Sequence, residues 1–165
     1  MHSNAPRINA AAVTPEGYQA LSGVERYIAT SSLDRLLVHL VKLRASQING
    51  CAFCIDMHWK DARAAGESEQ RLYGLDAWHE SPYYTERERA ALRWTESLTR
   101  IAETRAPDED FAALRAHFSD REIADLTVVI GMINCWNRLA IGLRWPSAGS
   151  YQPPRHSAAP EQPVA

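Results

Sequence analysis

The sequence lacks the features that define several large protein classes. Its 165 residues include only three cysteines, too few and too unevenly placed for a disulfide scaffold. The 18 basic residues are balanced by 20 acidic ones, and a net charge of -2 offers no basic surface for nucleic acid. No apolar run predicts a membrane span, and residues 1–6 lack the basic and apolar regions of a signal peptide. We therefore expect a cytoplasmic protein with no nucleic-acid or membrane partner.

Alternation of apolar and polar residues, which marks half-buried strands, is also missing. Apolar residues recur instead at helical spacing, as in the leucine-rich stripe that predicts a helix over about 33–47. Two capping boxes, Thr85-x-x-Glu88 and Ser119-x-x-Glu122, predict the starts of two further helices, the second running over about 120–144. The sequence therefore predicts an all-α protein.

The chain is expected to form one domain over residues 16–146. Residues 1–15 are polar and contain proline, and we expect them to form an extended arm. Residues 147–165 are rich in proline, serine and alanine, which predicts a disordered tail or one packed on a neighbouring subunit. Strongly amphipathic helices, five tryptophans and six tyrosines favour a homo-oligomer.

Residues 44–59 contain the densest chemistry of the chain. If a helix begins near Cys51, then Cys51, Cys54 and His58 lie on one face at i, i+3 and i+7. The helix N-terminus favours a thiolate at Cys51, and a neutral His58 can take the Cys54 proton. Such a thiolate can attack a peroxide and become a sulfenic acid, which the other cysteine converts to a disulfide. This spacing predicts a redox-active dithiol.

The same motif has other interpretations. Cys-x-x-Cys-x-x-x-His could supply three zinc ligands, but structural zinc sites take four, and no second ligand pair follows in the chain. Covalent haem attachment needs histidine directly after the second cysteine, where Ile55 stands. A thioredoxin-like site needs a strand before the motif, which the helical pattern excludes. We therefore expect no metal and no cofactor.

Several neighbouring residues have structural explanations. Cys135 is expected to be a small packed side chain, and Trp94 and Trp136 to be core or subunit contacts. His39 lies at the edge of the leucine-rich stripe, where periodicity alone predicts a boundary residue on a half-buried helix.

The run from Leu40 to His58 resembles the core motif of AhpD-like alkylhydroperoxidases, within the carboxymuconolactone decarboxylase family. The similarity extends through residues 60–67, 86–92 and 133–141, and covers roughly 17–145. It implies an AhpD-like bundle of about six to seven helices that assembles into dimers, trimers or hexamers. It also implies thiol peroxidase activity on hydroperoxides, with a thiol or lipoyl-type protein as reductant.

By position, the resemblance implies roles for four residues. Cys54 matches the peroxidatic cysteine, Cys51 the more exposed resolving cysteine, and His58 the relay histidine. The family usually has glutamate twelve residues before the first cysteine, where this chain has His39. His39 can still pass a proton near neutral pH, but it adds no negative charge. The decarboxylase branch lacks the cysteine pair, which argues against lactone decarboxylation.

The leading hypothesis is thus a thiol-dependent peroxidase in antioxidant defence that uses Cys54, Cys51, His58 and His39. The alternative is a redox-sensing or metal-binding helical oligomer without turnover. A third possibility is a helical scaffold whose cysteines no longer react.

Overall fold

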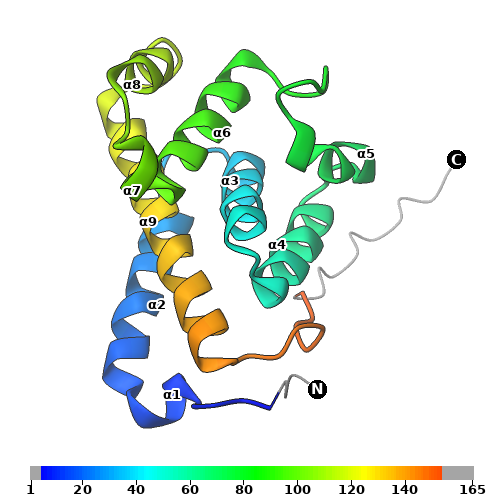
Figure 1. Ribbon diagram of the computed structural model, residues 1–165, viewed down its shortest axis with the longest axis vertical. Coiled ribbons are helices and arrows are strands. Elements are labelled where there is room, and N and C mark those ends of the chain that lie inside the picture. Colours follow the sequence, from blue (N-terminus) through cyan, green and yellow to red (C-terminus); the bar gives the residue numbers. More distant parts are fainter. Residues whose placement is uncertain (1–4, 154–165) are drawn as a thin grey trace, which may run out of the picture.

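The computed structural model describes residues 5–153, and this part of the chain is all-α, as predicted (Figure 1). The long helices are α2 (Pro15–Ala29), α3 (Arg35–Asn49), α4 (Ala52–Ala64), α6 (Glu86–Thr99) and α9 (Asp120–Leu143). The shorter elements are α1 (Ala10–Val13), α5 (Glu69–Tyr73), a 3-10 turn (Leu75–Ala77), α7 (Ile101–Thr104) and α8 (Asp108–Arg115). Nine α-helices lie among the described residues, more than the six to seven expected, because α1 and α7 are single turns too short to show a period.

Capping residues fix where the long helices begin. Thr85 and Glu88 exchange hydrogen bonds at the start of α6, and Ser119 and Glu122 do the same at the start of α9, so both predicted capping boxes are confirmed. The first four N–H groups of a helix have no partner within the helix, and these side chains satisfy part of that set. Asp34 caps α3 by accepting a hydrogen bond from the Leu37 N–H.

Helix α3 lies at the centre of the molecule, with α4, α6 and α9 packed around it (Figure 1). Its side chains Leu40, Val41, Leu43 and Ala45 have no exposed surface. Burying a leucine side chain stabilises a fold by about 1.5–3 kcal/mol, so this helix contributes strongly to the core. Because α4 and α9 both contact α3, the start of α4 is held between two other helices.

A buried charged group also joins α3 to its neighbours. The guanidinium of Arg44 donates from Nε to the Glu96 carboxylate at 2.9 Å, and the Trp78 indole donates to the same oxygen at 2.8 Å. Burial raises the pKa of Glu96, but the hydrogen bond from Trp78 and the Arg44 charge outweigh it, so this pKa lies below its usual value. Arg44 of the cysteine motif therefore has a structural role, linking α3 to α6.

Helix α9 is long and apolar enough, by length and composition, to cross a membrane, which was not expected from the sequence. Part of its apolar surface is explained by packing within the fold. Val129, Ile130 and Ile133 are buried against α3 and the helices beside it. A helix in the core of a folded domain can meet the same criteria of length and composition as a membrane span.

Both ends of the described chain pack on the helical body. The Arg7 backbone N–H donates to the carbonyl of Leu143 at 2.9 Å, which holds residues 5–9 against the end of α9. The extended arm expected over residues 1–15 includes the short helix α1, and α2 already begins at Pro15. After α9 the chain turns back, and Lys60 of α4 donates to the carbonyl of Tyr151 at 3.0 Å. The rest of the predicted tail, residues 154–165, lies outside the described residues.

The turn between α3 and α4 contains a left-handed residue. Gly50 has φ +69° and ψ +32° and ends α3, and its N–H donates to the carbonyl of Gln47. A side chain in this conformation brings Cβ close to the backbone, which only glycine avoids without cost. No other atom lies within 4 Å of the position that a Cβ would take, so the cost of substitution is conformational rather than steric.

We therefore expect Gly50→Ala to lower the free energy of unfolding by about 1–2 kcal/mol, the usual cost of a left-handed alanine. Gly131 is the matched control, because it also has open space but lies within helix α9. Gly131→Ala should raise stability by about 0.5–1 kcal/mol. Urea denaturation of both variants tests this, and equal effects would contradict a special role for the turn.

Candidate active site

The turn at Gly50 places both cysteines at the N-terminus of α4. Since α3 ends at Gly50, Cys51 becomes the N-cap residue of α4, and Cys54 lies one turn inside the helix. The Sγ atoms of Cys51 and Cys54 are 2.6 Å apart, and both residues are free cysteines. A disulfide bond joins sulfur atoms about 2.05 Å apart, so the pair can close with little movement.

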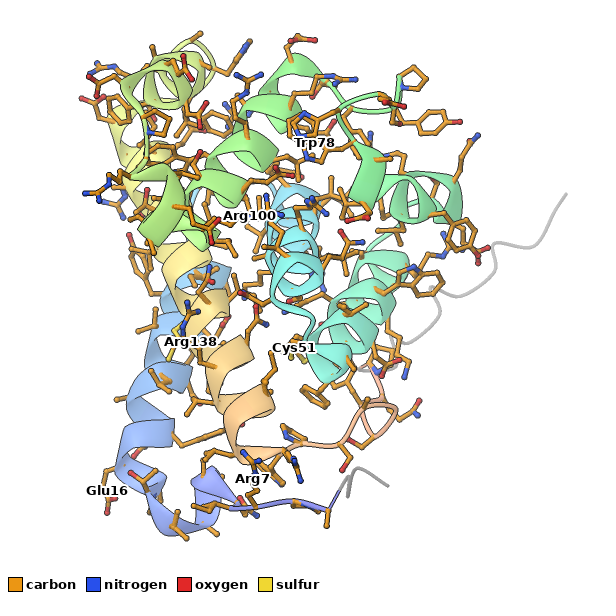
Figure 2. All side chains as sticks on the ribbon, viewed as in Figure 1. Arg7, Glu16, Cys51, Trp78, Arg100 and Arg138 are labelled. Carbon is orange, nitrogen blue, oxygen red and sulfur yellow. The ribbon has the colours of Figure 1, made fainter. Side chains whose placement is uncertain are left out.

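Both sulfur atoms are buried in the single chain. Cys51 is 1% exposed and Cys54 2% exposed, and they pack with Ala45 of α3 and Ile133 of α9. Figure 2 places Cys51 where α4 begins, between α3 and α9. In the single chain, therefore, neither cysteine is distinctly more exposed than the other, and the expected greater exposure of Cys51 stays a prediction. The turn directs this N-cap side chain inward, against the core, rather than toward solvent.

The two thiols differ in acidity because they share one proton. A hydrogen bond from the Cys54 thiol lowers the pKa of Cys51 to about 7, although burial acts in the opposite direction. The backbone N–H groups of Cys54 and Phe53 and the Asn137 side chain also favour the Cys51 thiolate. The same hydrogen bond and burial raise the pKa of Cys54. When the pair loses one proton, the negative charge is therefore favoured on Cys51 rather than on Cys54.

A buried amide network holds the turn in place. Asn137 of α9 has no exposed surface, and its Nδ2 donates to Ser46 Oγ at 3.1 Å. Asn49 donates from Nδ2 to the side-chain oxygens of Asn137 at 2.8 Å and Asn134 at 2.9 Å. These bonds link the end of α3 to the middle of α9. Sequence reasoning missed this network, and the available signal was two polar residues, three apart, within an apolar helix.

His58 and His39 lie next to each other but have no hydrogen-bond partner. His58 on α4 is 5% exposed, His39 on α3 is half-buried, and their ring centroids are 6.4 Å apart. All four ring nitrogens are buried, and within residues 5–153 none forms a hydrogen bond. The sequence suggests that His58 can take the Cys54 proton, but no hydrogen bond joins His58 to the Cys54 thiol among the described residues.

Both histidines are neutral at pH 7. Burial lowers the pKa of His58 well below its usual value, and the charge of Lys42 lowers it further. Burial also lowers the pKa of His39, where the nearby Asp61 carboxylate acts in the opposite direction. A neutral imidazole has one N–H donor and one lone pair. Each ring can therefore both donate to and accept from a molecule that enters the site.

A cavity of about 480 Å³ adjoins these residues. Cys54, His58 and His39 contribute to its polar side, and much of its remaining wall is aromatic: Tyr18, Phe53, Trp136, Trp145 and Tyr151. A separate hollow of about 340 Å³ reaches Cys51 and is lined in part by Ala52, Arg144 and Ser147. Cys54 and Cys51 thus line different openings, although their sulfur atoms are neighbours.

Trp94, Cys135 and Trp136 were expected from the sequence to be packing or subunit-contact residues. Trp94 is buried in the core, as expected, and Cys135 packs at the edge of the same core. Trp136 contacts the core and also lines the cavity, where its indole donates to Glu25 at 2.9 Å. The contribution of Trp136, Trp145 and Tyr151 to the cavity was not anticipated, because α9 and the segment after it meet α4 only in the folded chain.

Comparison with known proteins identifies the family. Residues 14–97 match the model of the carboxymuconolactone decarboxylase family. The chain is 44% identical over 137 residues to the uncharacterized protein YdfG of Bacillus subtilis, covering 83% of this chain and 93% of YdfG. The chain belongs to the carboxymuconolactone decarboxylase family. The resemblance derived from the cysteine motif is therefore confirmed.

Solved structures show the AhpD-like fold within this family. An Agrobacterium tumefaciens protein of unknown function, ATU0492, named as a candidate AhpD antioxidant defence protein, is 54% identical with a TM-score of 0.84. The matched region covers 86% of this chain and 97% of ATU0492. An uncharacterized peroxidase-related protein from Silicibacter is 26% identical with a TM-score of 0.72, over 81% of this chain and 71% of that one. The family member described here therefore has an AhpD-like helical fold.

We expect the dithiol to react with iodoacetamide with a pH midpoint near 7, measured by mass spectrometry in a Cys135→Ser background. The thiolate is the reactive form, and the pKa of Cys51 is about 7. Cys54→Ala removes the thiol that donates to Cys51, while burial still disfavours the charge. The midpoint should therefore move to higher pH in Cys54→Ala. Identical midpoints in the two proteins would contradict the shared proton.

Proposed function

We propose that this protein is a thiol-dependent peroxidase that reduces organic hydroperoxides in antioxidant defence. The observation that carries the proposal is the pair of buried sulfur atoms, 2.6 Å apart, beside a cavity lined by two imidazoles that have no hydrogen-bond partner within residues 5–153. Peroxide reduction needs a thiolate, a second thiol within bonding reach and a proton donor for the leaving oxygen. The names of the related structures support an activity of this kind.

Cys54 is proposed to attack the peroxide, because it lines the cavity with His58 and His39. In the singly deprotonated pair the charge is favoured on Cys51, so the Cys54 proton first moves across the 2.6 Å contact to Cys51. The Cys54 thiolate then forms a bond to one peroxide oxygen as the O–O bond breaks. Cys54 becomes a sulfenic acid, and the other oxygen leaves as an alkoxide that takes up a proton to give the alcohol.

Cys51 is proposed to resolve this intermediate. Its sulfur attacks the sulfenic sulfur of Cys54, so a disulfide forms and hydroxide leaves, which is protonated to water. A thiol or lipoyl-type protein reductant then attacks Cys51 through the hollow that adjoins it, and a second exchange returns both thiols. Separate openings lined by the two cysteines allow peroxide and reductant to approach from different sides.

His58 and His39 are proposed to handle protons inside the cavity. The neutral His58 ring can donate its N–H to the leaving oxygen, and His39 on the adjacent helix can restore that proton. This assignment places His58 beside the peroxide oxygens rather than as the base for Cys54. It is consistent with the free nitrogens of both rings among the described residues.

The wall of the cavity suggests the class of substrate. Five aromatic side chains line the cavity that Cys54 also lines, and such surfaces favour apolar ligands through area burial. We therefore infer a preference for hydroperoxides with an apolar or aromatic group over hydrogen peroxide. Homo-oligomerisation and a cytoplasmic location stay predictions from the sequence. A redox-sensing protein without turnover would use the same dithiol, and only catalysis distinguishes the two.

Peroxide consumption with a dithiol reductant tests the proposal. Cumene hydroperoxide and dihydrolipoamide should be turned over many times per molecule, whereas Cys54→Ser should abolish consumption. In the absence of added dithiol, Cys51→Ser should consume about one equivalent and then stop, because no neighbouring thiol resolves the sulfenic acid. Cys135→Ser is the control and should retain activity, since Cys135 lies at the edge of the core. Consumption of a single equivalent by the native protein would favour redox sensing instead.

The histidine assignment is tested separately. His58→Gln should lower kcat/KM for cumene hydroperoxide by roughly 10²–10⁴-fold, the usual contribution of a general acid. The exposed residue His117 provides the control, and His117→Gln should leave the rate unchanged. Because His58 is proposed to act on the leaving oxygen, alkylation of the dithiol by iodoacetamide should be affected far less than peroxide reduction. Equal losses in both reactions would contradict this role.

A further inference from the structure

Three potential metal ligands meet at one side of the cavity. His39 comes from α3, while His58 and Asp61 lie three residues apart on α4. One ligand atom from each residue lies within 4.8 Å of the other two. Two imidazole nitrogens and a carboxylate oxygen are ligands that zinc and related divalent ions accept.

The two histidines are buried without compensation from the described protein. Transfer of a polar group from water into an interior costs free energy unless the group forms a hydrogen bond. Neither nitrogen of His58 or His39 has such a partner within residues 5–153, and the His58 residue is only 5% exposed. Both rings also line the cavity. The cluster therefore places buried imidazole nitrogens, without hydrogen-bond partners among the described residues, beside a space that a ligand can enter.

We propose that His39, His58 and Asp61 form a binding site for a divalent transition-metal ion of the zinc class. Three protein ligands leave a fourth position open, which is the pattern of accessible rather than purely structural zinc sites. A bound ion would use one nitrogen of each imidazole and leave an N–H on the other, beside the cavity that Cys54 also lines. The sequence predicts no metal, because a zinc site built on the cysteine motif would lack a fourth ligand. The proposed site does not use the cysteines: the fold brings His39 and Asp61 to His58.

Tyr151 orients the carboxylate. Its hydroxyl donates to Asp61 Oδ1 at 2.6 Å, which leaves Oδ2 available as a ligand. Residues that hold metal ligands in position in this way contribute to affinity without touching the ion. Tyr151 is itself held by Lys60, which donates to its carbonyl. The segment after α9 thus completes the site from a distant part of the chain.

The charges around the cluster are mixed. Lys42 and Arg35 act on His39 as positive charges, and Lys42 also acts on His58. The Lys42 ammonium contacts the Glu25 carboxylate at 2.5 Å, which offsets its repulsion of a cation. Asp34 is a further negative charge near His39. With Asp61 as the negative ligand, these charges permit a divalent ion of moderate rather than very high affinity.

The test must separate this cluster from the dithiol, which also binds zinc-class ions. We therefore use the full chain with Cys51→Ser and Cys54→Ser, and titrate it with Co²⁺ while recording its visible absorption. One equivalent should bind, with bands typical of four- or five-coordinate cobalt, and Zn²⁺ should displace it. Absence of stoichiometric binding in this protein would overturn the proposal, whatever the outcome of the peroxidase assay.

Added substitutions identify the ligands. His39→Gln and His58→Gln should each weaken Co²⁺ binding by at least tenfold, and Tyr151→Phe by about tenfold because it acts through Asp61. His117→Gln is the exposed control and should bind normally. Circular dichroism without metal verifies that each variant is folded, and any unfolded one is replaced by the corresponding Asn variant. Binding that is unchanged in both His39→Gln and His58→Gln would also overturn the proposal.

Discussion

The left-handed conformation of Gly50 is the constraint on which the site depends. It ends α3 at a point where the chain can start α4 at once, so Cys51 becomes an N-cap residue rather than part of a longer helix. Its side chain then turns into the core and meets Cys54, and the Asn49–Asn137 hydrogen bond holds the turn against α9. The turn at Gly50 thus determines where α4 begins and places Cys51 beside Cys54.

The second theme is the burial of reactive groups. Cys51 and Cys54 are almost inaccessible, and His58 and His39 have no hydrogen-bond partner among the described residues. Such burial costs stability in a folded protein, but it raises the strength of electrostatic interactions inside the site. The cost is offset by a large apolar core around α3 and by capping of the long helices. The molecule therefore combines a well-packed scaffold with an unsatisfied polar cavity.

The sequence predicted the scaffold well and the site only in part. Helical periodicity and capping boxes located the long helices, because these signals depend on residues close in the chain. The spacing of Cys51, Cys54 and His58 identified the reactive segment for the same reason. Three features could not be predicted: the hydrogen bonds of Asn137, the burial of Cys51, and the contact of Tyr151 with Asp61. Each depends on packing between segments about 90 residues apart.

We infer that Cys51 and Cys54 form one redox unit in which a peroxide converts the dithiol to a disulfide. Peptide mass mapping after one equivalent of cumene hydroperoxide is added to reduced protein tests this inference. We expect an intramolecular Cys51–Cys54 disulfide, one equivalent of alcohol, and Cys135 still reduced. Recovery of sulfinic acid at a single cysteine, with the other thiol free, would contradict it.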